Sequence, residues 1–147
     1  KTRKILKKSN QFFKGRYDFE ISHHYGLEKF NKYGLVLLTV LNREYCKKIL
    51  VVFPGQKHPE QWHKVKEETF HVLHGNIKLR LNGSLKDYSE GSLITIKPGV
   101  KHEFSSKHGS VVEEISTTHI KKDSFYTDNK IMKNLNRKTN VSYYWDS

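Results

Sequence analysis

Short apolar or alternating runs recur along the chain from Tyr17 onward, each bounded by turn-forming residues. In chain order they are YDFEIS, LVLLTVL, CKKILVVF, ETFHVLHG, IKLRL, SLITI and SVVEEIS. They are short and rich in Val, Ile, Leu and Phe, so they predict β-strands. Many short strands with little helix are typical of a sandwich or a barrel.

Turn signals and one helical segment add detail to this pattern. Asn82-Gly83 predicts a tight type I′ hairpin, because both central positions of that turn need a positive φ. Pro98-Gly99 predicts a second turn. The segment GLEKFNKYG, residues 26–34, fits one short helix that ends at Gly34.

The two ends of the chain differ from the strand-rich middle. Residues 1–15 are polar and basic without a period, which predicts an arm that is flexible or loosely docked. Residues 121–147 are charged, and we expect them to be irregular or partly helical. This tail carries Phe125, Tyr126, Tyr143, Tyr144 and Trp145. Aromatic side chains are seldom free in water, so we expect the tail to pack on a barrel of residues 16–120 or on a second subunit.

Length and composition indicate one domain. A chain of 147 residues is long enough to bury one core. Its longest apolar stretches, Leu35–Leu38 and Ile49–Phe53, are far shorter than the ~20 residues that cross a bilayer. Because Cys46 is the single cysteine, no internal disulfide can form, and we expect the cytoplasm. The chain begins at Lys1 rather than at methionine, so it is expected to be trimmed or part of a longer protein.

The formal charge of +12 raises the question of nucleic-acid binding. The basic residues gather at the two ends of the chain, and lysine far outnumbers arginine, the residue preferred for base readout and phosphate clamps. Solvated lysine-rich termini explain this distribution better. We therefore expect no specific nucleic-acid partner and no membrane partner.

Candidate metal ligands gather in two stretches. Gln61 and His63 stand two residues apart, so on one strand both would point to the same face. Glu68 follows after a short turn, and His102 would point inward from a later strand. Two imidazoles and one carboxylate on one face suit Mn(II), Zn(II), Fe(II) or Ni(II), and a glutamine amide oxygen would complete the set weakly.

The other histidines lack this spacing, and we interpret them as structural or exposed. They are His23, His24, His58, His71, His74, His108 and His119. Of these, His58 could replace Gln61 as a ligand if its loop bends inward. The alternative for the whole set is a metal-free barrel with a polar interior.

The spacing of the candidate ligands resembles the first cupin motif, G-x5-H-x-H-x(3,4)-E-x6-G. Gly55, His63, Glu68 and Gly75 match it, and Gln61 stands where the first histidine usually is.

The second stretch resembles the second cupin motif, G-x5-P-x-G-x2-H. Gly91, Gly99 and His102 are in register, and Pro98 is displaced by one position. The resemblance implies a double-stranded β-helix, a jelly-roll barrel, with a divalent metal at Gln61, His63, Glu68 and His102. It also implies a homodimer, which would cover an exposed sheet edge.

Beyond these motifs, HKVKEETFHVLHG, VVEEISTTH, DSFYTDNKI and NRKTNVSYYW resemble the cupin domain at the end of some sialic acid synthase-like proteins. More distantly, they resemble the D-lyxose isomerase family. Both relatives handle sugars. The departure at Gln61 bears on isomerase activity in particular, because that family uses both histidines of the motif.

A sugar isomerase also needs a base that moves a proton between neighbouring carbons. In SVVEEISTTH the alternation offers two choices. Glu113 would face inward with Val111 and Ile115, or Glu114 would do so with Val112. The apolar alternation favours Glu113, whereas the family resemblance favours Glu114, which we choose as the catalytic candidate. We assign no role to the lysines of KVKEE and CKK, because solvated lysines are far commoner.

Three functional classes follow from these features. The first is metal-dependent sugar isomerase or epimerase chemistry in surface-carbohydrate metabolism. The second is a non-catalytic cupin that binds a sugar and regulates or docks to a synthase. The third is a non-haem Fe(II) dioxygenase, since two histidines and one carboxylate can also hold the Fe(II) that reacts with oxygen.

Overall fold

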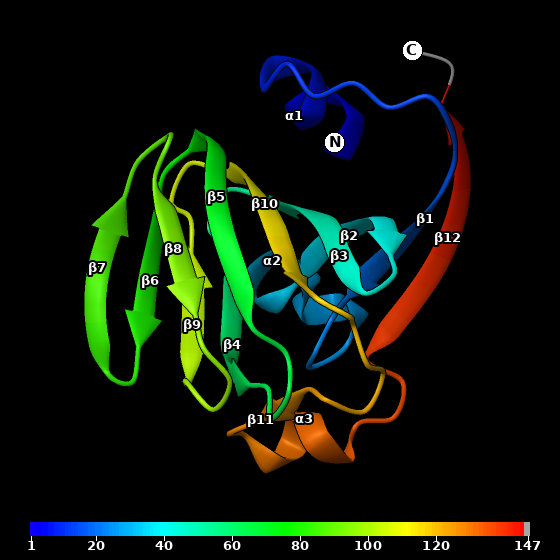
Figure 1. Ribbon diagram of the computed structural model, residues 1–147. Helices are drawn as coiled ribbons and strands as arrows, with labels where there is room; N and C mark the ends of the chain where they lie inside the picture. The colour runs from blue at the N-terminus through cyan, green and yellow to red at the C-terminus, as the bar shows by residue number, and fades with distance from the viewer. Residues whose placement is uncertain (146–147) are drawn as a thin grey trace.

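The computed structural model describes residues 1–145, which form two antiparallel sheets (Figure 1). The larger sheet has the strand order β12-β1-β2-β3-β10-β5-β8, and the smaller has the order β11-β4-β9-β6-β7. The strands of the larger sheet are β12 (Lys138–Trp145), β1 (Gly15–Ser22), β2 (Leu35–Asn42), β3 (Tyr45–Val52), β10 (Ser110–Thr117), β5 (Glu68–Gly75) and β8 (Leu93–Ile96). Those of the smaller sheet are β11 (Phe125–Tyr126), β4 (Lys57–Trp62), β9 (His102–Ser105), β6 (Ile77–Leu81) and β7 (Ser84–Tyr88). This arrangement confirms the predicted all-β class.

Each of the seven runs predicted from the sequence forms a strand, namely β1, β2, β3, β5, β6, β8 and β10. The predicted hairpin connects β6 and β7, with Asn82 at φ 46° and Gly83 at φ 86°. Both angles are positive, as a type I′ turn requires. The Pro98-Gly99 turn is also present, and there the Gly99 N–H donates to the His63 carbonyl at 2.7 Å. That bond connects this turn to the end of β4.

The main core lies between the two sheets. Inward-pointing residues of both sheets form it, with Phe70, Leu79 and Phe104 among the most buried. The remaining buried members are Leu35, Leu50, Val52, Val72, Ile77, Ile94, Ile96 and Val112. This packing follows from alternation, since every second residue of a strand points to the same side.

The helices are few and short. They are α1 (Thr2–Lys8), the 3₁₀ turn η1 (Leu27–Lys29), α2 (Phe30–Tyr33) and α3 (Asn129–Lys133). The predicted helix over residues 26–34 is thus a 3₁₀ turn followed by one α-helical turn, which ends at Gly34 as expected. None of the helices in the described part of the chain has the length and hydropathy to cross a membrane.

The N-terminal segment is more ordered than the sequence predicts. Residues 2–8 form α1, which lies over the outer face of the larger sheet (Figure 1). Its Leu6 is 1% exposed and packs in a second core with Phe19, Leu38 and Val111. The prediction of a flexible or loosely docked arm is therefore wrong for α1. The many basic residues of this segment gave no sign that one apolar side chain, Leu6, is buried against the outer face of the sheet.

The C-terminal tail is also more regular than expected. Residues 138–145 form β12, which pairs with β1 in register from Gly15↔Trp145 to Ser22↔Lys138. The prediction of an irregular tail is wrong for this segment, because alternating lysine, threonine, serine and asparagine obscured a run with Val141, Tyr143 and Tyr144 that favours extended backbone. Asp146 and Ser147 lie outside the described residues.

We expect Leu6→Ala to lower the free energy of unfolding by about 2–4 kcal/mol, because it empties a buried leucine site. Chemical denaturation followed by tryptophan fluorescence measures this. The matched control is Leu135→Ala, since Leu135 is 90% exposed and should tolerate the change within about 0.5 kcal/mol. Equal effects of the two substitutions would show that α1 is not docked.

Candidate metal centre and the charged cavity beside it

Three of the predicted ligands meet at one end of the barrel. His63 follows the last residue of β4, Glu68 begins β5 and His102 begins β9. Their nearest ligand atoms all lie within 4.8 Å of one another. Oε1 of Glu68 is 2.9 Å from Nε2 of His102 and 3.5 Å from Nε2 of His63. All three side chains are buried, so the cluster lies inside the barrel.

The two histidines are held so that their Nε2 atoms face Glu68. Nδ1 of His63 donates to the Asp123 carbonyl at 2.7 Å, and Nδ1 of His102 donates to the Val100 carbonyl at 2.9 Å. With the proton on Nδ1, each Nε2 presents a lone pair, which is the form that binds metals. Backbone carbonyls therefore fix both the ring orientation and the tautomer.

Three of the facing atoms of this cluster have no hydrogen-bond partner among residues 1–145. They are Nε2 of both histidines and Oε1 of Glu68, all buried, whereas Oε2 of Glu68 faces the Lys66 ammonium at 3.2 Å. Leaving such polar groups unpaired costs about 1–3 kcal/mol each. A divalent cation would satisfy all of them at once, and two imidazoles with one carboxylate match the ligand preferences of Mn(II), Fe(II), Zn(II) and Ni(II). The residues present thus fit a metal ion.

Gln61 lies beside these ligands but is less completely enclosed. It pairs with His102 across β4 and β9 and with Tyr126 across β4 and β11. Its side chain lines a small cavity beside the cluster, which is described below. A β-bulge between His58 and Gln61 shifts the register here. Gln61 thus lies on the inner side of the barrel, where it was expected. Its role as a metal ligand stays a prediction.

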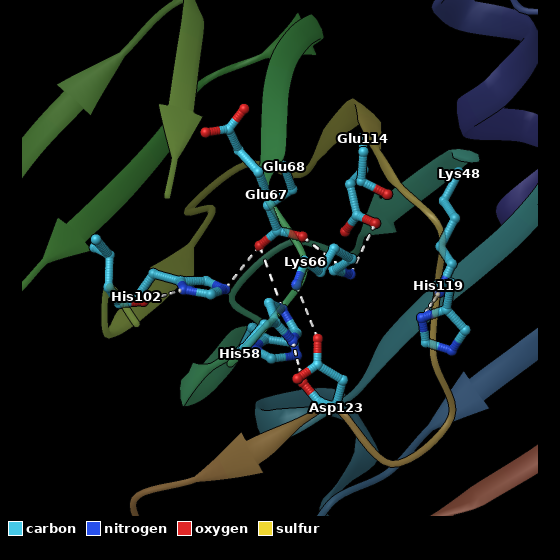
Figure 2. A network of polar contacts seen from close by, with 12 residues as sticks. Lys48, His58, Lys66, Glu67, Glu68, His102, Glu114, His119 and Asp123 are labelled. Carbon is cyan, nitrogen blue, oxygen red and sulfur yellow. Dashed lines mark hydrogen bonds and ion pairs between the residues drawn. The ribbon is translucent and has the colours of Figure 1, made fainter. Parts of the chain in front are cut away.

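Lys66 connects the cluster to a second carboxylate. Its ammonium is 3.2 Å from Oε2 of Glu68 and 3.3 Å from Oε2 of Glu114, and all three side chains are buried. Figure 2 shows Glu68 between His102 on one side and Lys66 on the other, with Glu114 beyond the lysine. One buried cation thus holds two carboxylates in fixed positions.

Between the two candidate glutamates, the structure places Glu114 inside. Glu113 points to the opposite side of β10, where it pairs with Lys47 at 3.0 Å. The apolar alternation misled because Val111 and Val112 are both fully buried, Val111 in the core under α1 and Val112 in the core between the sheets. A register shift between them in the pairing with β5 marks a bulge.

Charge and burial compete in this cluster. Burial alone would raise the pKa of Glu68, but the charge of Lys66 and the contacts with both histidines lower it well below its usual range. Burial would lower the pKa of His102, but its contact with Glu68 raises it. Burial and the charge of Glu68 raise the pKa of Glu114, and Lys66 opposes them. The same surroundings thus favour the ionised form of Glu68 more strongly than that of Glu114.

Asp123 of the C-terminal tail supports the candidate metal centre from below in Figure 2. Its carboxylate accepts the backbone N–H groups of Lys64, Val65 and Lys66 at 2.8–3.2 Å, while its carbonyl accepts from His63. Burial alone would raise the pKa of Asp123, but these backbone donors lower it. One residue thus fixes the turn between β4 and β5 together with a candidate ligand.

A cavity of about 40 Å³ opens beside the cluster, enough for a few water molecules. Its polar lining residues are Glu20, Ser22, Lys48, His58, Gln61, His63, Lys66, Glu114, His119, Ser124 and Lys138. Sequence reasoning left out Lys48, Lys66 and His119. A signal existed for Lys48, because it stands between Cys46 and Leu50 in the inward alternation of β3. For Lys66, in a turn, and for His119, in a loop, no periodicity was available.

Two further histidines, His58 and His24, are buried close to the cluster. His58 is buried, stacks on Phe104 at 4.9 Å and donates from Nδ1 to the Pro59 carbonyl. It lies outside the three-residue cluster, although it lines the same cavity. His24 is buried against His58 and Tyr126, and burial lowers its pKa to about 4. These positions agree with the structural roles expected for both.

Comparison with known proteins identifies the family. The cupin domain family model matches residues 48–116. The D-lyxose/D-mannose isomerase of Thermosediminibacter oceani is 29% identical over 136 residues, with 73% of this chain and 75% of that protein covered. The D-lyxose ketol-isomerase of Cohnella laeviribosi is 31% identical over the same length and coverage. This chain belongs to the D-lyxose isomerase family of cupins.

Solved structures agree with the fold of this cupin. The L-ribose isomerase of Cellulomonas parahominis with L-ribose matches with a TM-score of 0.72 at 12% identity, covering 90% of each chain. The L-ribose isomerase of Geodermatophilus obscurus matches with a TM-score of 0.67 at 14% identity, covering 77% of this chain and 81% of that one. At such identities the likeness establishes the double-stranded β-helix.

We expect Asp123→Ala to weaken Mn²⁺ binding by about tenfold or more, because it frees the turn that positions His63. Isothermal titration calorimetry with Mn²⁺ measures this. Asp87→Ala, on the exposed side of β7, is the control and should bind as the parent does. Unchanged affinity in the Asp123 variant would show that the turn holds without the carboxylate.

Proposed function

We propose that this cupin is a metal-dependent sugar isomerase that interconverts an aldose and the corresponding ketose. The observation that carries the proposal is the buried ligand set of His63, Glu68 and His102, joined through Lys66 to the inward-facing Glu114. The curated relatives named for D-lyxose and D-mannose support an aldose of that kind as substrate.

The metal would be held by His63, Glu68 and His102, with Gln61 as a weak fourth ligand. When bound, a divalent cation polarises the carbonyl and the adjacent hydroxyl of an open-chain sugar. The loss of one imidazole at Gln61 leaves three strong ligands, which still suffices for a catalytic site with open positions. Mn, Zn, Fe and Ni all remain compatible with this donor set.

Glu114 is the proposed base. Aldose–ketose conversion moves the proton of C2 to C1, while the O2 hydroxyl proton passes to O1. The Glu114 carboxylate takes the proton from C2 and returns it to C1, so it ends the cycle as it began. Lys66 keeps this carboxylate at a fixed distance from the metal ligands, and the buried walls exclude bulk water.

We also propose a soluble homodimer in the cytoplasm that serves surface-carbohydrate metabolism. The last of these rests on the resemblance to sialic acid synthase-like proteins. The dimer is supported by β12, an edge strand of the larger sheet whose Val141, Tyr143 and Tyr144 are exposed. Light scattering should give twice the chain mass. A monomeric mass at micromolar concentration would contradict the dimer.

The test of the proposed activity uses protein stripped of metal and reloaded separately with Mn²⁺, Zn²⁺, Ni²⁺ or, without oxygen, Fe²⁺. We expect at least one reloaded form to convert D-lyxose or D-mannose to its ketose, measured by ketose formation. We expect Glu114→Gln to lower kcat at least about a hundredfold, since a carboxamide cannot accept the proton. Glu113→Gln is the matched control and should retain activity.

Other outcomes point to the other classes. Full turnover by Glu114→Gln would exclude it as the base. Oxygen uptake by the Fe²⁺ form without ketose formation would indicate a dioxygenase. Sugar binding without turnover under any metal would indicate a binding or regulatory domain.

A further inference from the structure

Lys48 is a buried cation that the proposed chemistry does not use. It lies in the middle of β3, points into the cavity beside Glu114, and is 6% exposed. Its ammonium donates to Nδ1 of His119 at 3.1 Å. Figure 2 shows this pair on the side of Glu114 away from His102. The pair thus faces the cavity at a distance from the metal ligands.

The nearby carboxylates are engaged by other lysines. Lys66 binds Glu68 and Glu114, and Lys138 binds Glu20 at 3.2 Å. Within residues 1–145, Lys48 forms no ion pair with a carboxylate, and its one hydrogen-bond partner is an imidazole. A buried charge without a counter-ion is costly. Burial accordingly lowers the pKa of Lys48, with the more distant Glu114 opposing.

His119 is fixed in an orientation that leaves one donor free. Its backbone N–H donates to Asn42 and its carbonyl accepts from the same side chain, at 2.8 and 3.1 Å. Since Nδ1 accepts from Lys48, the neutral ring carries its proton on Nε2. Burial and the charge of Lys48 lower the pKa of His119 to about 4, so the ring is neutral at neutral pH. Beyond the bond between them, Lys48 and the Nε2–H of His119 therefore offer donors for which residues 1–145 supply no carboxylate acceptor.

Building on the proposed isomerase, we propose that its substrate carries an acidic group, a carboxylate or a phosphate, and that Lys48 with His119 binds this group. An anion there would receive charge-assisted hydrogen bonds from Lys48 and a bond from His119. It would also supply the counter-charge that this buried lysine lacks. The lining has three lysines against two glutamates, and adding Glu68 of the neighbouring cluster makes these charges equal, so a bound divalent metal would make the cavity net positive before substrate enters.

A neutral sugar would leave Lys48 unpaired in the complex. The competing explanation is that Lys48 serves only to tune Glu114 electrostatically. If Lys48 only tunes Glu114, removing the lysine should lower kcat/KM equally for neutral and acidic sugars. If Lys48 binds the acidic group, kcat/KM should fall further for the acidic sugars. The ratio of kcat/KM for an acidic sugar to that for a neutral sugar therefore separates the two explanations.

The experiment compares D-mannose, D-mannuronate and D-mannose 6-phosphate, which differ only at C6. We expect kcat/KM for at least one acidic sugar to exceed that for D-mannose by about tenfold or more. In Lys48→Met this preference should fall to about one. Lys47→Met is the matched control, since Lys47 is the neighbouring residue on the opposite face of β3, and it should keep the preference. The carboxylate and phosphate arms identify which acid fits.

Equilibrium binding separates this inference from the proposed activity. Calorimetric dissociation constants for the same three sugars on metal-loaded protein need no turnover. Acid-selective binding that Lys48→Met abolishes would support the inference even if no sugar is isomerised. Equal constants for neutral and acidic sugars would overturn it even if D-mannose is isomerised. If the methionine variant does not fold, Lys48→Gln, which keeps a donor for His119, gives the same comparison.

Discussion

The ion pairs around Glu68 are the interaction on which the functional end of the barrel depends. A carboxylate with 1% exposure is stable as an anion only when its surroundings supply compensating charge and donors. Here Lys66 supplies the charge on one side and two histidines face it on the other. Because the same lysine also contacts Glu114, the positions of both glutamates follow from one buried cation.

The larger sheet carries this arrangement because β10 is covered on both sides. Val111 packs under α1, and Val112 packs between the sheets. The bulge that permits both also turns Glu114 inward and leaves Glu113 on the far side with Lys47. The outer core around Leu6 therefore does more than add stability, since it covers the strand that carries the candidate base.

Much of the fold followed from the sequence, because alternation in the β-strands and positive-φ turns are local properties. The motif spacing likewise predicted that His63, Glu68 and His102 lie close together, as they do, since side chains alternate between the two faces of a strand. Lys66 and His119 were missed because they lie in irregular segments, where spacing says nothing about direction. Asp123 was missed because its contacts join the tail to the turn after β4.

The errors at the two ends share one physical cause. Leu6 in α1 and the aromatic residues of β12 are stabilised by partners distant in the sequence, while their own neighbours are polar. Local composition therefore resembled solvated chain. Which end residues are buried depends on the open face and edge of a sheet that only the folded protein presents.

The place of Asp123 in the chain has a consequence for biosynthesis. The turn that holds His63 is translated well before the residue that clamps it, and Ser124, Tyr126 and Lys138 of the cavity wall follow later still. The barrel strands up to β10 can pair before residues 123–138 have left the ribosome, but the pocket is complete only once those residues have emerged. A chain truncated before Asp123 would then be a barrel with an open, unformed centre.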